Sequence, residues 1–235
     1  FDWRNRLPFA RVGLAELVML GGLMFLLAAV FAVVFWPLAI GFALAGLGLA
    51  WFFRDPEREI PGEPGAVVSP ADGRIVAVEE VADEFVGGEA VLIGIFLSVF
   101  NVHLNRAPVE ARVVGLRYRR GKFLNALRPA SARENERMEI RFEQTGFRGR
   151  RLVVRQIAGA IARRIVCWMA PGDVAGRGER FGMIKLGSRT ELVLPRERGL
   201  EILVSPGQKV RAGSSILARY STDEAPGGEP AAGGP

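Results

Sequence analysis

The sequence is poor in the residues that most often build disulfides and metal sites. It has one cysteine and one histidine in 235 residues. A single cysteine, Cys167, excludes an intrachain disulfide and a cysteine-based metal cluster, and its apolar neighbours favour a buried small side chain. We therefore expect no bound metal, and any histidine chemistry falls on His103 alone.

Charge is also missing from one long run, Leu17 to Phe53. A single helix over this run would be about 55 Å long at about 1.5 Å per residue, whereas a bilayer's hydrocarbon core is about 30 Å thick. Proline disrupts a helix interior, so the Trp36-Pro37 pair predicts two helices, Leu17–Phe35 and Leu38–Phe53. The second helix is short, which leaves a re-entrant hairpin open.

Arginines flank both ends of the charge-free run, with Arg4, Arg6 and Arg11 before it and Arg54 and Arg58 after it. Cytoplasmic flanks of membrane segments are rich in Lys and Arg. We therefore expect both ends of the hairpin, and the rest of the chain, on the cytoplasmic side of the cell membrane. A cleaved secretory signal is the alternative, but its apolar region would run only about 7 to 15 residues.

The net charge is +6, from 31 basic and 25 acidic residues. The basic residues are nearly all arginine and are scattered, without the motif or aromatic pattern of a nucleic-acid module. Beside a membrane anchor, such charge attracts anionic lipid by about 1 kcal/mol per residue near the surface. The predicted partner is therefore the membrane and not a nucleic acid.

The chain divides by composition into four parts. Residues 1–53 form the predicted membrane anchor, 54–65 a Pro- and Gly-rich linker, 66–220 a β domain, and 221–235 a tail whose Gly, Pro, Ala and acidic content predicts disorder. Short strands separated by turns predict a mainly β sandwich or barrel. The expected strands are Arg74–Glu79, Val91–Ser98, Val109–Arg119, Met138–Glu143, Arg151–Ile157, Ile161–Met169, Thr190–Leu194, Leu200–Val204 and Ser215–Tyr220.

Two segments of the β domain have a similar sequence pattern: VVSPADGRIVAVE (67–79) and VSPGQKVRAGSSILARY (204–220). Each places a turn between valine-rich strands. They look like the paired halves of a barrel-sandwich hybrid. The predicted fold is therefore a barrel-sandwich-like β domain behind an N-terminal membrane hairpin.

Three polar residues form a candidate catalytic set. Taken singly, each has a structural explanation: His103 as a satisfied lone histidine, Asp72 in an Asp-Gly turn, and Ser188 in a turn after Gly187. Together they are the minimum for an activated hydroxyl, in which a base takes the serine proton and a carboxylate orients the base. No G-x-S-x-G elbow accompanies them, which disfavours an ordinary α/β hydrolase.

The chain resembles the phosphatidylserine decarboxylase proenzymes, in particular their shorter branch with a hydrophobic N-terminal region. The likeness covers nearly the whole chain. Six sequence blocks in family order carry it: FFRDPER (52–58), SPADGRI (69–75), FLSVFNVHLNRAP (96–108), ENER (134–137), QIAGAIARRIV (156–166) and RFGMIKLGSR (180–189).

The resemblance implies self-cleavage between Gly187 and Ser188, with Ser188, His103 and Asp72 as the catalytic triad. Ser188 would become a covalent pyruvoyl cofactor that forms a Schiff base with the amine of phosphatidylserine in the bilayer. The lipid would lose carbon dioxide and leave as phosphatidylethanolamine. The two processed chains, β ending at Gly187 and α starting at 188, would stay associated, and a homo-oligomer is left open.

Substrate-binding candidates and two departures from the longer branch complete the prediction. Arg106, Arg163 and Arg164 are candidates for holding the lipid phosphate or carboxylate, with a solvated charged face as the alternative. The longer branch has threonine where Arg189 stands, which leaves the scissile pair intact. It also has a second histidine in place of Arg106, so how one histidine serves both cleavage and decarboxylation stays open.

Two other functions compete with this one. A membrane-anchored barrel-sandwich adaptor would keep the two valine-rich turns without needing His103 or the Gly187-Ser188 pair. A membrane serine hydrolase would share the triad but leave the chain intact.

Overall fold

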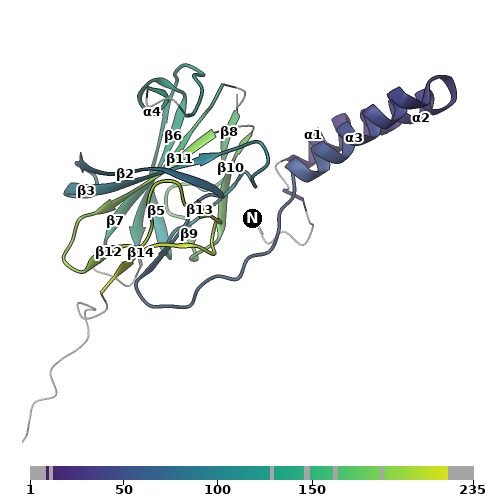
Figure 1. Ribbon diagram of the computed structural model, residues 1–235. Helices are drawn as coiled ribbons and strands as arrows, with labels where there is room; N and C mark the ends of the chain where they lie inside the picture. The colour runs from purple at the N-terminus through teal and green to yellow at the C-terminus, as the bar shows by residue number, and fades with distance from the viewer. Residues whose placement is uncertain are drawn as a thin grey trace, which may run out of the picture.

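A computed structural model describes residues 9–10, 13–127, 130–145, 149–160, 164–185 and 188–221. Most of the predicted tail, 222–235, lies outside this part. The described chain forms a β domain from which a helical hairpin projects (Figure 1). This confirms the predicted mainly β fold with an N-terminal hairpin.

The first arm of the hairpin is a continuous helix of α1 (Leu14–Glu16), the π-helical η2 (Leu17–Gly21) and α2 (Gly22–Val34). The second arm is α3 (Trp36–Phe52). The break falls at Phe35 (φ −157°, ψ 86°), one residue before the predicted break at Trp36-Pro37. Pro37 instead sits in the first turn of α3, where its missing N–H has no intrahelical partner to lose.

The two arms lie side by side and antiparallel (Figure 1). The Phe31 and Phe42 rings stack between them with centroids 5.6 Å apart. The segment Leu14–Val34 is long and apolar enough to cross a membrane, with a mean hydropathy of 2.8, and α3 is a shorter apolar helix. Large apolar side chains such as Val33 (91% exposed) and Trp36 (67% exposed) point away from the protein. Such an exposed apolar surface marks a site of membrane or protein contact.

Fourteen strands and one short helix follow among the described residues, and every strand pairing is antiparallel. An eight-stranded curled sheet has the order β13-β2-β3-β11-β7-β6-β5-β9, and two three-stranded sheets have the orders β1-β14-β12 and β4-β10-β8. The bounds are β1 Ala66–Val68, β2 Gly73–Asp83, β3 Gly88–Leu97, β4 Leu104–Arg106, β5 Ala111–Arg119, α4 Ser131–Glu134, β6 Arg137–Gln144, β7 Arg151–Ile157, β8 Arg164–Cys167, β9 Val174–Ala175, β10 Arg180–Lys185, β11 Ser188–Pro195, β12 Leu200–Ile202, β13 Lys209–Val210 and β14 Ile216–Tyr220.

The two similar segments predicted to form paired halves do pair. β1 runs against β14, with Ala66 opposite Arg219. β2 meets β13, with Arg74 opposite Lys209. The N- and C-terminal parts of the β domain are therefore joined through both pairings.

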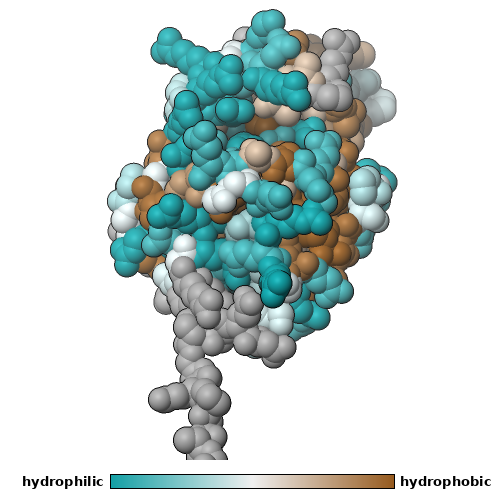
Figure 2. All heavy atoms as spheres, turned by 90° about the vertical axis from the view of Figure 1, so that its left-hand side faces the viewer, coloured by the Kyte–Doolittle hydropathy of each residue, from teal (hydrophilic) through white to brown (hydrophobic). Residues whose placement is uncertain are grey.

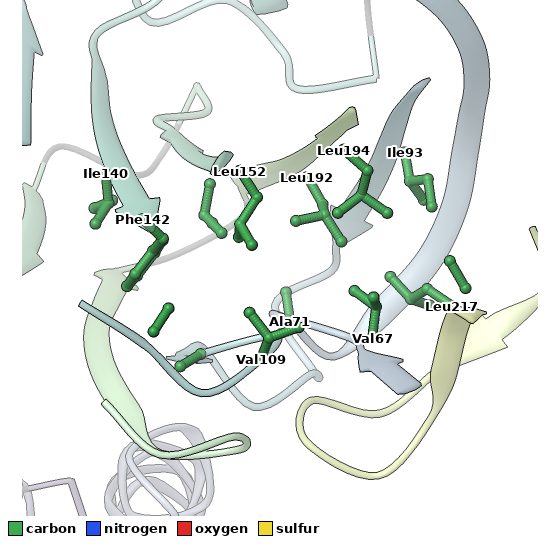
Figure 3. Packing of buried hydrophobic residues seen from close by; sticks show 14 of the residues in the cluster. Val67, Ala71, Ile93, Val109, Ile140, Phe142, Leu152, Leu192, Leu194 and Leu217 are labelled. Carbon is green, nitrogen blue, oxygen red and sulfur yellow. The ribbon is translucent and has the colours of Figure 1, made fainter. Parts of the chain in front are cut away.

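The core lies between the curled sheet and the smaller sheets. Ile93, Leu152 and Leu192 from the large sheet face Val67 and Leu217 across it (Figure 3). Side chains alternate between the two faces of a strand. Residues 188, 190, 192 and 194 of β11 therefore share the core face, whereas 189 and 191 face outward.

Hydrophilic side chains cover much of the face of the β domain turned away from the hairpin, with smaller hydrophobic patches among them (Figure 2). The opposite side contacts the hairpin. There Phe52 and Phe53 at the end of α3 pack with Leu104 and Met183 of the β4-β10-β8 sheet. The hairpin is therefore fixed to the sheet that leads into Ser188.

The predicted linker, 54–65, has little regular structure but is held in place. The buried Asp55 carboxylate accepts a hydrogen bond from Arg180 Nε at 2.8 Å and lies 3.5 Å from Arg106 Nη2. Arg106 also donates to the Pro56 carbonyl at 3.1 Å. These contacts join the helical hairpin to the β domain.

Candidate active site

Ser188 is the first residue of β11 and lies opposite Leu97 at the end of β3. Its side chain is fully buried, and Oγ has no hydrogen-bond partner among the described residues. A buried hydroxyl without a hydrogen-bond partner lowers the stability of the folded state by about 1–3 kcal/mol. Ser188 therefore destabilises the fold, which points to a functional reason for a serine at this position. Gly187, the other half of the predicted cleavage site, lies outside the described residues.

His103 lies beside the strand that leads to this bond. Its carbonyl accepts a hydrogen bond from the Ile184 N–H in β10 at 3.1 Å. Its Nδ1 is 2.9 Å from the Asn101 carbonyl oxygen. Because a carbonyl only accepts, Nδ1 carries the proton in the neutral ring, and Nε2 carries the lone pair. The geometry therefore sets the tautomer that a general base needs.

The surroundings of His103 keep the ring uncharged. The ring is 1% exposed and packs against Phe52 with centroids 4.5 Å apart. Burial lowers the pKa of His103 to about 4; the hydrogen bond to Asn101 opposes this shift and the charge of Arg54 adds to it. At neutral pH the imidazole is therefore uncharged and Nε2 keeps its lone pair, while the same burial makes the ring a weaker base.

Asp72 stands just before β2, in the predicted Asp-Gly turn. Its Oδ1 accepts a hydrogen bond from the Ala212 N–H at 2.7 Å, and its Oδ2 accepts one from Arg58 Nη2 at 2.8 Å. These contacts tie Asp72 to the linker and to the turn after β13. The Asn101 carbonyl contributes to the orientation of His103, and a direct catalytic role of Asp72 stays a prediction.

Asp72 and Asn101 both line a cavity of about 460 Å³, which lies at the start of β2 and the end of β3. Gly73 permits the close approach there, because a Cβ at this position would lie 2.2 Å from the Phe96 carbonyl oxygen. Three cationic side chains line the same cavity. They are Arg74, Lys209 and Arg211.

The sequence did not single out these three cations. The only local signal was their position in the two valine-rich turn segments, which looked like ordinary turns. Once β13 pairs with β2, Lys209 stands opposite Arg74. A cluster of cations at a cavity favours an anionic ligand.

The three arginines predicted to bind substrate fall in different places. Arg106 is buried and donates to the Gly178 carbonyl at 2.9 Å as well as to the linker. Burial, with a contribution from the charge of Arg180, lowers the pKa of Arg106 to about 10. Arg164 begins β8, is exposed, and lies 3.7 Å from Glu16. Arg163 lies outside the described residues.

A second cavity, of about 660 Å³, separates the base of the hairpin from the loop after β3. Its walls are almost wholly apolar, and Phe52 belongs both to these walls and to the packing around His103. At one end Lys185 forms an ion pair with Glu16 of α1. An apolar groove therefore runs from the base of the helical hairpin to the immediate surroundings of the candidate base. The lining residues are Glu16, Leu20, Ala45, Gly48, Leu49, Trp51, Phe52, Phe53, Val99, Phe100 and Lys185.

Comparison with known proteins gives a consistent result. A family model described as phosphatidylserine decarboxylase matches residues 47–218. A phosphatidylserine decarboxylase proenzyme of Rhodopirellula baltica is 55% identical over 94% of this chain and 91% of its own length. Proteins of the same description from Symbiobacterium thermophilum and Chlorobium phaeobacteroides are 51% and 42% identical, over 77% and 85% of this chain and 84% and 90% of their own lengths.

Proposed function

The chain belongs to the phosphatidylserine decarboxylase family, and we propose that it converts phosphatidylserine to phosphatidylethanolamine and carbon dioxide after cutting itself between Gly187 and Ser188. One observation carries the proposal beyond family membership. The Ser188 hydroxyl is buried without a described partner, beside the strand pair that holds the neutral His103. The relatives' description as proenzymes is consistent with processing.

Self-cleavage begins with proton transfer from the Ser188 hydroxyl to Nε2 of His103. The serine oxygen attacks the Gly187 carbonyl carbon, and the acyl group moves from nitrogen to oxygen to give an ester. Loss of the Ser188 α proton then breaks the bond to the ester oxygen and releases the Gly187 carboxylate. Water hydrolyses the dehydroalanine that remains, which releases ammonia and leaves a pyruvoyl group at residue 188.

The surroundings of Ser188 fit such a group. The residue is small and fully buried, and Ser188 Oγ makes no hydrogen bond among the described residues that conversion would break. A pyruvoyl group supplies a carbonyl that withdraws electrons as a carboxyl group leaves, the role of an electron sink. No external cofactor and no metal is required.

The pairing of β11 keeps the two products of cleavage together. β11 lies between β3 and β7, and β14 pairs with β1. A cut before Ser188 therefore separates the chain but leaves both sets of strands in one core. The predicted β and α chains, 1–187 and 188–235, stay associated for this reason.

The hairpin and the two cavities suit a lipid substrate. The exposed apolar surface of α2 and α3 anchors the protein in the bilayer, with the β domain on the cytoplasmic side. The apolar groove beside Phe52 admits acyl chain from the membrane. Arg74, Lys209 and Arg211 attract the phosphate and carboxylate of the head group.

Purified protein in lipid nanodiscs tests the proposal. Wild type is expected to run as two fragments on a denaturing gel and to release labelled carbon dioxide from carboxyl-labelled phosphatidylserine. Ser188→Ala is expected to remain one band and release none, whereas the control Ser205→Ala, in an exposed loop, behaves as wild type. An intact but fully active wild type would overturn the proposal, and an intact, inactive wild type would favour the adaptor.

A further inference from the structure

A buried asparagine in β4 holds together the three segments that carry the candidate catalytic residues. Asn105 has no solvent exposure. Its Nδ2 donates to the Pro70 carbonyl at 3.2 Å and to Thr190 Oγ1 at 3.1 Å. Its Oδ1 accepts a hydrogen bond from Gln156 Nε2 at 2.8 Å. The side chain therefore uses both amide hydrogens and its oxygen.

The positions of these partners follow a common spacing. Pro70 is two residues before Asp72, and Thr190 is two residues after Ser188. Asn105 itself is two residues after His103. Residues two apart along a strand point to the same face, so Thr190 and Ser188 both face the core. One side chain thus connects the Asp72 loop, the His103 segment and the Ser188 strand.

The orientation of the Asn105 amide is fixed by its neighbours. The Pro70 carbonyl only accepts, so Nδ2 must face it, and Oδ1 must face the Gln156 amide group. Gln156 in turn stands opposite Thr190 in the β7–β11 ladder. Gly182 of β10 makes room for Gln156, because a Cβ there would lie 2.6 Å from Nε2. Three hydrogen bonds therefore restrain the Asn105 side chain in this buried network, although Gln156 Oε1 has no hydrogen-bond partner among the described residues.

We propose that Asn105 is the positioning residue for self-cleavage: its hydrogen bonds to Pro70 and Thr190 fix the Asp72, His103 and Ser188 segments relative to one another. Asn105 does not itself exchange a proton with the reacting atoms. The inference rests on the proposed cleavage at Gly187-Ser188. Displacing a reacting group by about 1 Å can slow a reaction about 100-fold, which is the effect that loss of the whole side chain should have.

Thr190 gives the sharpest test, because two substitutions separate hydrogen bonding from packing. Thr190→Val keeps the shape of the side chain but removes the acceptor for Asn105. Thr190→Ser keeps the acceptor but removes a methyl group. A positioning role predicts that Val is the harmful change, whereas a packing role predicts that Ser is.

The assay follows precursor disappearance after a pulse of cell-free synthesis into lipid nanodiscs. We expect cleavage to slow about threefold to tenfold in Thr190→Val, the size of one hydrogen bond, and to stay within about twofold of wild type in Thr190→Ser. Asn105→Ala should slow cleavage about 100-fold. The matched control is Tyr220→Phe, which removes a single buried hydrogen bond, 3.1 Å to the Pro195 carbonyl, at the other end of β11. It should cleave at the wild-type rate.

Failure of this inference is distinguishable from failure of the proposed function. If wild type cleaves but Thr190→Val cleaves equally fast, or Thr190→Ser is the slower variant, Asn105 does not position the site. Equal slowing by Tyr220→Phe would also overturn the inference, because the effect would then be general loss of stability. A wild-type precursor that never cleaves would overturn both.

Discussion

The single histidine allows a direct test of the proposed base. The ring of His103 is 1% exposed, packs 4.5 Å from the Phe52 ring, and lies close enough to Arg54 to feel its charge. Together these place its pKa at about 4 instead of 6.5. A difference of this size disfavours the imidazolium by roughly 3 kcal/mol. His103 should therefore be neutral throughout the physiological range.

The measurement is an NMR titration of protein labelled with ¹³C-histidine, carrying a histidine-free affinity tag, in lipid nanodiscs. One imidazole signal is expected, with its midpoint near pH 4. Phe52→Ala removes the ring that covers His103, so its midpoint should rise toward 6.5. Phe31→Ala removes a hairpin ring that stacks on Phe42 instead and should leave the midpoint unchanged.

Two results would refute this reasoning. A wild-type midpoint near 6.5 would mean that the ring is solvated and that the packing around Phe52 is wrong. A midpoint near 4 that Phe52→Ala does not move would mean that burial by Phe52 is not the cause.

Three further predictions concern the lipid groove, the cationic cavity and acid stability. Gly48→Leu should fill the apolar groove and raise the KM for long-chain phosphatidylserine severalfold without slowing self-cleavage. The control is Gly41→Leu, which is also on α3 and also has open space at its Cβ, but lies outside the groove. It should change neither the KM nor the rate of self-cleavage. Lys209→Ala and Arg211→Ala should each raise the KM for phosphatidylserine by about threefold to tenfold, the effect of losing one charge-assisted contact. A KM equal to that of wild type would show that these two side chains do not bind the head group. Because the pKa of His103 is lower in the folded state, its contribution to stability is complete above pH 6.5 and is lost as the pH falls toward 4. In the uncut Ser188→Ala background, the protein with His103 should lose about 2 kcal/mol more between pH 8 and pH 5 than the protein with His103→Gln, as measured by chemical unfolding. An equal loss would contradict the shifted pKa.

The sequence predicted the features that depend on local pattern. The charge-free run Leu17–Phe53 predicted the hairpin because it is too long for one membrane-spanning helix and has a proline near its middle. The break lies one residue before the predicted one because proline is tolerated in the first turn of a helix, so Pro37 lies in the first turn of α3 and does not precede the helix. Short apolar segments separated by turn residues predicted strands such as Arg151–Ile157, whose bounds the structure matches.

Contacts between distant segments were beyond the reach of local pattern. Arg106 appeared as a candidate for the substrate, but its guanidinium contacts Pro56 and lies near Asp55, about fifty residues earlier in the chain. Asn101 appeared only as part of a sequence block, yet its carbonyl sets the tautomer of His103. Such roles depend on how loops meet after folding, which neither periodicity nor spacing encodes.

The central claim is that Ser188 is converted by self-cleavage into the group that performs decarboxylation. Mass spectrometry of the smaller chain from freshly purified wild-type protein tests it most directly. We predict a chain that begins at residue 188 with a pyruvoyl group, lacks a free amino terminus, and is absent from Ser188→Ala. An ordinary serine at that position, or an uncut chain that still decarboxylates phosphatidylserine, would contradict the claim.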